Sequence, residues 1–460
     1  MSDEARPGER QATFREVFSN GEYRALYSAN ALSWIGNYLA KVAVTALVFA
    51  ETDSVALSAA TFALSYLPWL VGGPFLAALA ERYRYRSVMV ACDLVQMVLI
   101  AAVALISLPT AAVMVLLFLA SMAAPPAQAA KSAALPQILR GDRLVVGLSL
   151  NLTTGQVAQV VGYVAGGALS VLSPRLALLI NAATFAASAA IIRFGVRDRP
   201  PAMTAVHRSH LLRETGEGFA MIWSSPVLRA IQILVFTSML FAIVPEGLAA
   251  GWAAALLGTQ SERELAQGVI MAANPVGQML GALLIARLVR PDIRRRLIRP
   301  LAILAPLALV PALFNPGVAG IVAMAAVCGF AVAGMMPALN GLFVQALPDA
   351  YRARAFGVMQ SGVQTMQGIA VLGTGLLASR FSLPTVVGLW SLAGVLLIAL
   401  AAARWPRPAE FAAATAAAGN RSQAARGSDD RVPVRAAAAP QPLPGPQSRK
   451  SHAPGVGSAA

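Results

Sequence analysis

Apolar runs of roughly 20 residues recur along the chain from Leu26 to Ala403. Each run is long enough to cross ~30 Å of bilayer hydrocarbon as a helix. The chain is 57% hydrophobic and 12% charged, whereas a soluble domain is nearer half apolar and a quarter charged. No series of segments with alternating polarity suits a membrane barrel. The sequence therefore predicts an all-α membrane protein.

The runs predict twelve transmembrane helices. Their expected ranges are Ala25–Phe49, Leu57–Leu79, Val88–Ser107, Ala111–Ala127, Leu148–Val171, Leu176–Ile192, Ala230–Ala255, Ala266–Ile285, Leu301–Leu313, Ala319–Leu342, Phe356–Leu377 and Thr385–Ala402. Pro306 and Pro311 interrupt the ninth, which a membrane helix tolerates where neighbours satisfy the freed carbonyls.

Positive charge gathers in alternate loops. The net charge is +15, but no soluble domain carries a basic patch, so nucleic acid is not an expected partner. If the N-terminus is cytoplasmic, the inner loops hold nearly all loop arginines, and the outer loops hold only Arg175, Arg263 and Arg380. This asymmetry predicts a multi-pass protein of the cytoplasmic (inner) membrane with both termini inside.

The chain divides into five parts. We expect an N-terminal cytoplasmic segment (1–22), a six-helix half (23–194), a cytoplasmic linker (195–226), a second six-helix half (227–403) and a tail (404–460). The tail has almost no large apolar residues after Phe411, so it is predicted to be disordered. Ala134-Leu135-Pro136 with Arg140 recurs as Ala346-Leu347-Pro348 with Arg352, which suggests two halves related by a parallel repeat.

Residues for enzyme chemistry are not evident. Cys92 and Cys328 lie inside apolar runs, and His207, His210 and His452 lie in a loop and the tail. Neither set predicts a metal site or a disulfide. No phosphate-binding glycine loop precedes Lys131-Ser132. We therefore expect no catalytic residues, no metal and no cofactor. We expect the energy for transport to come from an ion gradient or from the substrate's own gradient.

The segment from Gly73 to Arg86 resembles the signature between helices 2 and 3 of the major facilitator superfamily. Glu81 takes the place of the signature aspartate, Arg82 matches, and Tyr85-Arg86 ends the motif. The resemblance implies the twelve-helix major facilitator fold and a cytoplasmic latch between the halves formed by Glu81, Arg82 and Arg86. A generic charged turn is the simpler alternative.

Further stretches resemble the branch of that family that contains the enterobactin exporter and drug effluxers. These are Ser33-x-x-Gly36-Asn37, Ala124-Pro125-Pro126-Ala127 and Gln345-x-x-Pro348-x-x-x-Arg352-x-Arg354. The stretch Gly162-Tyr163-Val164-Ala165-Gly166-Gly167 takes the place of a Gly-Pro-x-x-Gly-Gly antiporter motif, with Tyr163 instead of the proline.

Polar residues inside the predicted helices are functional candidates because they are costly in a bilayer. Lys41, Asp93 and Glu246 are ionisable. Helical spacing places Asn30, Trp34, Asn37 and Lys41 on one face of helix 1, and the resemblance implies that helix 1 lines a central cavity. Further stripes comprise Gln156, Gln159 and Tyr163, and Gln360, Gln364 and Gln367. These amides either contact substrate or only bond helices together.

Two charge pairs are expected. Lys41 and Glu246 lie at ~24 and ~25 Å along helices 1 and 7, so we predict a pair that forms when the outer gate closes and parts on opening, allowing Glu246 to take up a proton. A static pair, or a lysine that extends toward the bilayer surface, is the alternative. Asp93 is predicted to pair with Lys131, with a proton-carrying role as the less favoured option.

The predicted function is proton-coupled efflux of a small, partly hydrophobic molecule such as a drug, secondary metabolite or siderophore. The expected partners are the substrate, protons and the lipid bilayer, with the chain acting as a monomer. An importer of a nutrient or siderophore, or a transporter-fold receptor or lipid-handling protein without ion coupling, are the alternatives.

Overall fold

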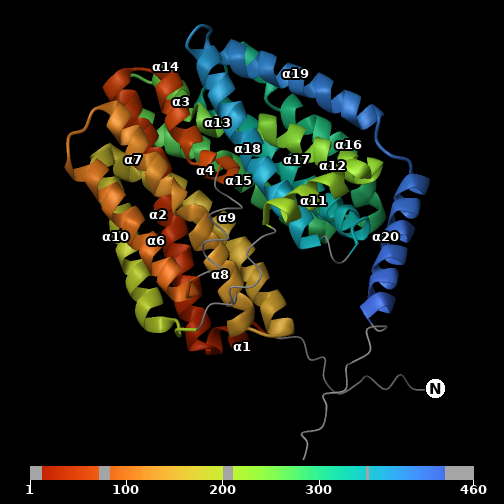
Figure 1. Ribbon diagram of the computed structural model, residues 1–460. Coiled ribbons are helices and arrows are strands. Elements are labelled where there is room, and N and C mark those ends of the chain that lie inside the picture. Colours follow the sequence, from red (N-terminus) through yellow and green to blue (C-terminus); the bar gives the residue numbers. More distant parts are fainter. Residues whose placement is uncertain (1–12, 72–82, 200–210, 349–351, 430–460) are drawn as a thin grey trace, which may run out of the picture.

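The computed structural model describes residues 13–71, 83–199, 211–348 and 352–429, and their regular secondary structure is helical (Figure 1). A short helix, α1 (Phe14–Ser19), precedes the first long one. The first half of the bundle comprises α2 (Gly21–Thr52), α3 (Val55–Leu64), α4 (Leu67–Val71), α6 (Tyr85–Leu105), α7 (Thr110–Met122), α8 (Ala124–Ile138), α9 (Asp142–Leu172) and α10 (Pro174–Gly195).

The second half follows the linker helix α11 (Leu211–Ser224). It comprises α12 (Pro226–Ala242), α13 (Val244–Gly247), α14 (Ala249–Leu256), α15 (Gln260–Leu288), α16 (Pro291–Leu307), the 3₁₀ turn η2 (Val310–Phe314), α17 (Val318–Gln345), α18 (Arg352–Ala378) and α19 (Leu383–Ala403). The last described helix, α20 (Pro408–Asp429), leaves the bundle after α19 (Figure 1).

Ten spans in the described ranges are long and apolar enough to cross a membrane. Several combine consecutive helices, as α7 with α8 and α12 with α13. α18 adds a further 27-residue helix, and α3 is a shorter apolar helix. The protein is thus a multi-pass helical membrane protein, and the count of twelve spans stays a prediction.

Proline positions explain two of the breaks. The predicted interruption of the ninth span is confirmed, since α16 contains Pro306 and ends at Leu307, and η2 begins one residue before Pro311. The seventh span breaks around Pro245 into α12, α13 and α14, because proline lacks the amide hydrogen that a continuous helix needs. The break places Glu246 in the one-turn helix α13.

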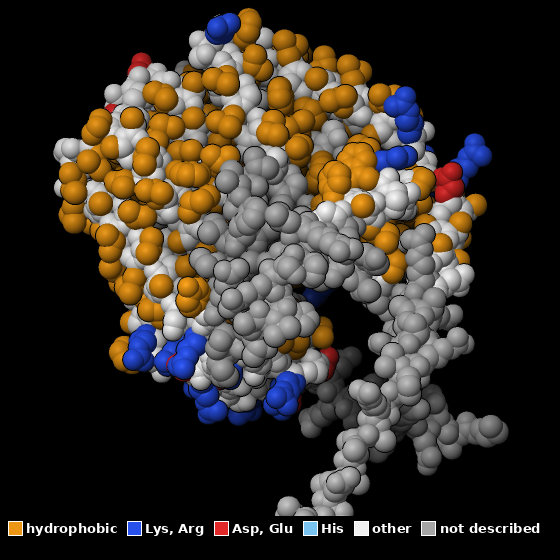
Figure 2. All heavy atoms as spheres, in the orientation of Figure 1, with side chains coloured by type: hydrophobic (Ala, Val, Ile, Leu, Met, Phe, Trp, Pro, Cys, Tyr) orange, Lys and Arg blue, Asp and Glu red, His pale blue; other side chains and the backbone are white. Residues whose placement is uncertain are grey.

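The molecule has two distinguishable ends, named here from their residues. The arginine-rich end contains Arg84, Arg86, Arg197 and Arg199 beside the start of α2, and α16 begins at the same end of its half. The distal end contains the α2–α3, α9–α10 and α14–α15 connections. Figure 2 shows apolar side chains over much of the visible face, with Lys and Arg side chains gathered below them on the first half. Exposed apolar residues such as Leu152, Leu288 and Leu396 belong to this surface, as expected where lipid replaces water.

The two halves meet mainly through α9 against α15 and α18 against α3. Small residues allow these helices to approach closely. At the distal end, a Cβ on Gly167 of α9 would lie 2.8 Å from the Glu264 carbonyl oxygen and 3.0 Å from Gly268 Cα of α15. Nearby, a Cβ on Gly375 of α18 would lie 2.6 Å from Ala59 Cβ of α3. Backbone contact of this kind is how membrane helices associate tightly without a hydrophobic driving force.

The tail and the linker each contain a helix that was not predicted from the sequence. Residues 404–460 were expected to be disordered, but Pro408–Asp429 forms α20. The expectation weighed the low content of large apolar residues and neglected the high helix propensity of the alanine-rich stretch. Glu410 also caps the start of α20 by accepting from the Arg407 amide at 2.7 Å. In the linker, α11 packs against α12 and α18.

Candidate transport cavity and buried carboxylate

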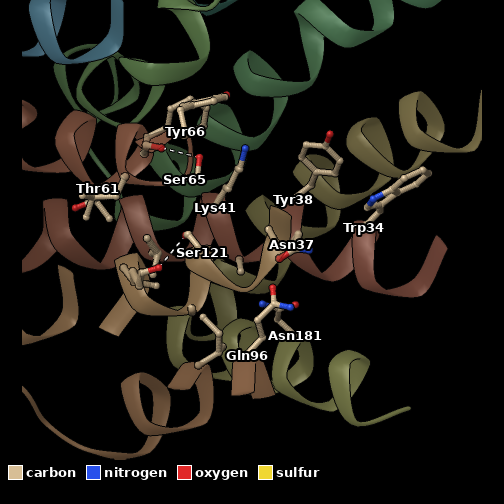
Figure 3. Close-up of a pocket in the computed structure, with 18 of the residues that line it drawn as sticks. Trp34, Asn37, Tyr38, Lys41, Thr61, Ser65, Tyr66, Gln96, Ser121 and Asn181 are labelled. Atoms are coloured by element: carbon tan, nitrogen blue, oxygen red, sulfur yellow. Dashed lines mark hydrogen bonds between the residues drawn. The ribbon is translucent and has the colours of Figure 1, made fainter. Parts of the chain in front are cut away.

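A cavity of ≈ 210 Å³ lies beside α2 in the first half of the bundle (Figure 3). Its walls come from α2, α3, α4, α6, α7, α8 and α10, and Gln364 of α18 contributes from the second half. Apolar and aromatic side chains form most of the lining, including Phe62, Trp69 and Phe185. Such a cavity suits a ligand with an apolar body.

Amide side chains form a polar wall in this cavity. Figure 3 shows Gln96 and Asn181 close together beside Asn37. The Asn181 side chain is 1% exposed, and its Nδ2 has no hydrogen-bond partner within the described residues. Its Oδ1 accepts from Thr184 Oγ1 at 3.3 Å. The unpaired donor can serve a ligand, because a buried polar group without a partner is costly.

Three of the four residues of the predicted helix 1 stripe lie at this cavity. Trp34, Asn37 and Lys41 line the cavity. Asn30 is buried, does not line it, and its Oδ1 has no partner among the described residues. Gly36 explains why the stripe can sit against α10, since any Cβ there would collide with Asn181 and Thr184.

The Lys41 ammonium lies in an aromatic cage. Its Nζ is 4.8 Å from the ring centre of Tyr66, 5.2 Å from Phe62 and 5.4 Å from Tyr38. Each cation–π contact contributes about 0.5–2 kcal/mol, more where water is excluded. None of the ion pairs found in the described part of the chain involves Lys41.

The Glu246 carboxylate bonds to the other half of the molecule. Glu246 is 3% exposed, and its Oε2 accepts from Tyr163 Oη at 2.8 Å and from Gln159 Nε2 at 3.5 Å. Both donors lie on α9, whereas Glu246 lies on α13. The carboxylate thus connects the two halves.

The direct Lys41–Glu246 ion pair predicted for a closed outer gate is wrong for this structure. The two groups are near enough to interact electrostatically, but each has other contacts. Tyr38 contacts both sites, because Lys41 lies over its ring and the Tyr163 ring packs edge-on against it at 5.3 Å. Within the described residues, the ammonium contacts aromatic rings and the carboxylate accepts from Tyr163 and Gln159, and no ion pair joins the two.

Hydrogen bonds and glycines close the distal side above these groups. Gln267 Nε2 of α15 donates to Thr45 Oγ1 at 2.7 Å and to the Val42 carbonyl at 3.1 Å, both on α2. Together with Gly167 and Gly268, these residues form what we call the distal gate. The gate is closed in this structure.

The predicted glutamine stripes separate into different roles. Gln156 donates to Gln278 Oε1 of α15 at 3.2 Å, so it bonds helices of the two halves, as Gln159 does through Glu246. Gln364 lines the cavity. Gln360 is exposed and does not line it, and Gln367 lies against Met239.

Asp93 bonds to a partner that the sequence did not predict. It is 1% exposed, and its Oδ2 accepts from Ser188 Oγ of α10 at 2.6 Å. The expected ion pair with Lys131 is not formed in this structure, although Lys131 is near enough to interact electrostatically. The prediction failed because approximate helix boundaries do not define which way a side chain faces.

The Asp93–Ser188 bond should therefore matter for stability. Asp93→Ala removes the acceptor and also the negative charge that interacts with Lys131, so it should cost more than the loss of one hydrogen bond to a charged group, ~1.5–3 kcal/mol. Ser188→Ala removes one hydrogen bond to a charged group and costs ~1.5–3 kcal/mol. We expect the melting temperature of the purified protein to fall in that order. Unchanged melting of both variants would contradict the structural role of Asp93.

Of the three predicted latch residues, only Arg86 lies among the described residues. Glu81 and Arg82 lie outside the described residues. Arg86 pairs with Asp198 at 3.3 Å, and Arg84 pairs with the same carboxylate at 2.5 Å. Asp198 follows α10 in the same half, so Arg86 contributes to packing within the first half rather than to contact between halves.

Several site residues were not predicted from the sequence. Tyr38, Phe62 and Tyr66 were missed because aromatic residues are common in apolar runs. Gln96, Asn181 and Gln267 carry a signal that was available, since each is an amide inside a predicted span.

The geometry defines a class: a polytopic helical bundle of two halves, with a polar cavity beside their interface and a buried carboxylate that connects them. The family model described as Major Facilitator Superfamily matches residues 26–260 and 250–437. The chain belongs to this superfamily and is a membrane transporter of that type. No curated protein sequence matches it.

Solved structures show the same fold at low identity. The nucleoside transporter NupG is 16% identical, with a TM-score of 0.64 over 84% of this chain and 99% of NupG. A POT family transporter in complex with 5-aminolevulinic acid is 11% identical, with a TM-score of 0.65 over 82% and 94%. A bacterial homolog of the lysosomal transporter Spinster, in an inward-facing and occupied conformation, is 14% identical, with a TM-score of 0.63 over 86% and 97%.

Proposed function

We propose that this protein exports a small, partly hydrophobic molecule from the cytoplasm in exchange for protons. The observation that carries the proposal is the Glu246 carboxylate of α13, which accepts hydrogen bonds from Tyr163 and Gln159 of the opposite half. A titratable group at this position makes contact between the halves depend on protonation.

The ionised carboxylate stabilises the closed distal gate. Hydrogen bonds to a charged acceptor are roughly twice as strong as those to a neutral one. Protonation of Glu246 therefore weakens its bonds to α9 and favours separation of the halves at the distal end. Without a proton or a substrate, the ionised carrier stays closed on that side.

This dependence favours antiport over symport. An antiporter must not change conformation when it is empty. It must change conformation when either the proton or the substrate is bound. A symporter requires the empty carrier to change conformation. A bond that holds the empty, ionised carrier closed meets the first requirement for the closed state, which then opens on the distal side only after a proton or a substrate has bound.

The cavity supports the proposed substrate class. Phe62, Trp69 and Phe185 offer an apolar wall, while Asn37 and Asn181 offer hydrogen-bonding groups. We also propose that the arginine-rich end faces the cytoplasm of a cell with this protein in its inner membrane, by the positive-inside rule. Cavity and carboxylate come from one chain, so a monomer suffices.

A cellular efflux assay tests the function. Cells that make the protein should accumulate less of a fluorescent amphiphile, within a panel that includes ethidium and Hoechst 33342, than cells with an empty vector. Collapse of the proton gradient should raise accumulation to the empty-vector level, because the driving force is lost. Higher accumulation in the producing cells, abolished by the same treatment, would show proton-driven import and contradict the proposal.

A further inference from the structure

A second groove, of ≈ 880 Å³, lies at the arginine-rich end of the second half, far along the chain from the cavity residues of α2. Its lining comes from α16, the end of α17, the turn after α19 and the start of α20. Arg295, Arg296 and Arg299 form its basic wall, and Ile298, Leu342, Trp405 and Phe411 form its apolar wall. We call it the α16–α20 groove.

Among the described residues, the arginines of this groove have no acidic partner. No carboxylate lines the groove, and none of the ion pairs within the described ranges involves Arg295, Arg296 or Arg299. The nearby Glu410 instead caps α20. Arg299 lies four residues after Arg295 and three after Arg296, so it shares a helix face with both.

A basic pocket in the first half provides a contrast. It is lined by Arg86, Arg140, Arg197 and Arg199. Glu22 pairs with Arg199, and Asp198 pairs with Arg86. The hydrogen bonds that Arg199 donates to Glu22 also raise the pKa of Arg199 above its ordinary value. Two of the four arginines in that pocket are thus ion-paired, whereas no ion pair in the described ranges involves the three arginines of the α16–α20 groove.

The position of the groove along the bundle indicates at which level of the membrane it lies. The arginines occupy the first turns of the span that runs from Asp292 to Phe314, and arginine is strongly disfavoured in hydrocarbon. These turns therefore lie at the headgroup level. Trp405, directly after the spanning helix α19, matches the usual place of tryptophan at a membrane surface. It stacks with Phe411 of α20 at 5.7 Å.

We propose that the α16–α20 groove binds an anionic phospholipid, with the phosphate against Arg295, Arg296 and Arg299 and apolar lipid atoms against Trp405 and Phe411. Guanidinium groups recognise phosphate through paired hydrogen bonds, and the adjoining apolar wall distinguishes a lipid from a free anion. The lipid also fixes α20 against the second half.

Native mass spectrometry of the purified full-length chain tests this proposal. The probes are dioleoylphosphatidylglycerol, dioleoylphosphatidylcholine and glycerol 3-phosphate. We expect phosphatidylglycerol to bind at least about tenfold more tightly than the other two. Each arginine near an anionic group contributes about a fivefold change in affinity, so R295Q/R296Q/R299Q should weaken phosphatidylglycerol binding about 100-fold. W405A/F411A should weaken it as well, because the acyl contact is lost.

The matched control changes three arginines at the same end of the first half, R140Q/R193Q/R197Q, which has the same net charge as the groove triple variant. It should retain most of the phosphatidylglycerol binding. Equal losses in both triple variants would overturn the proposal, because they would reflect general attraction to a basic surface. Binding of glycerol 3-phosphate as tight as that of phosphatidylglycerol, or no preference over phosphatidylcholine, would overturn it too.

Discussion

Glu246→Gln is expected to abolish proton-driven efflux while leaving the fold and substrate binding largely intact. Glutamine matches glutamate in shape and can still accept from Tyr163, but it cannot change charge. Efflux against a gradient should therefore fall to the empty-vector level, whereas exchange of substrate down its own gradient should persist. The two activities are measured in proteoliposomes with and without an imposed pH gradient.

Glu264→Gln is the matched control for this substitution. Glu264 is also a buried carboxylate, 5% exposed, near the distal end of α15. Its Oε1 accepts from Gln260 of its own helix, so its charge does not connect the halves. Proton-driven efflux should survive in this variant. Efflux by Glu246→Gln that equals the parent's across a pH gradient would remove Glu246 from the mechanism.

Gly167→Val should prevent closure of the distal gate. The new Cβ would meet backbone atoms of Glu264 and Gly268 at 2.8–3.0 Å, and backbone atoms cannot move aside as a flexible side chain can. The halves should separate at the distal end, so that the variant folds but transports at the empty-vector level. Accessibility of a single cysteine at Thr45 to a membrane-impermeant thiol reagent measures the opening.

The control for this prediction is Gly341→Val on α17, where a Cβ would have no neighbour within 4 Å. Valine costs only a few tenths of a kcal/mol more than an average residue in a helix, so transport should persist. Gly167→Val with parental transport and an inaccessible Thr45 position would show that the glycine contact does not govern the gate.

The depth of a residue within the bundle could be predicted from the sequence better than the direction in which its side chain points. Apolar run lengths located the spans, and Pro306 and Pro311 located the break in the ninth, because both depend on local chemistry. Lys41 and Glu246 were placed at similar depth, and the structure brings them within electrostatic range. Their partners were missed because Tyr163 and the cage of Tyr38, Phe62 and Tyr66 depend on helix rotation.

Other contacts between residues that are distant in sequence also could not be predicted. Asp93 bonds to Ser188, which is distant in sequence, rather than to Lys131. Order in the tail depends on helix propensity and on Trp405 and Phe411, which are partly buried and pack against the hydrophobic core. The role of Tyr163 could be suspected from its substitution for a motif proline, but its acceptor could be identified only in three dimensions.

The central claim is that the charge of Glu246 controls the distal gate, and a spin-label distance measures this directly. Nitroxide labels are attached to cysteines at the exposed distal positions Glu51 and Ser261, after replacement of Cys92 by serine and Cys328 by alanine. The distance between the labels is recorded in nanodiscs as the pH is lowered. The Gln267 amide does not titrate, so its contacts with α2 add no pH dependence to the distance.

Acidification should raise the population with the longer distance by about tenfold, because a bond to a charged group is worth ~1.5–3 kcal/mol and one to a neutral group ~0.5–1.5 kcal/mol. Glu246→Gln should show the longer distance at every pH and lose the dependence. A Glu246→Gln variant that keeps the pH dependence of the parent protein would contradict the account.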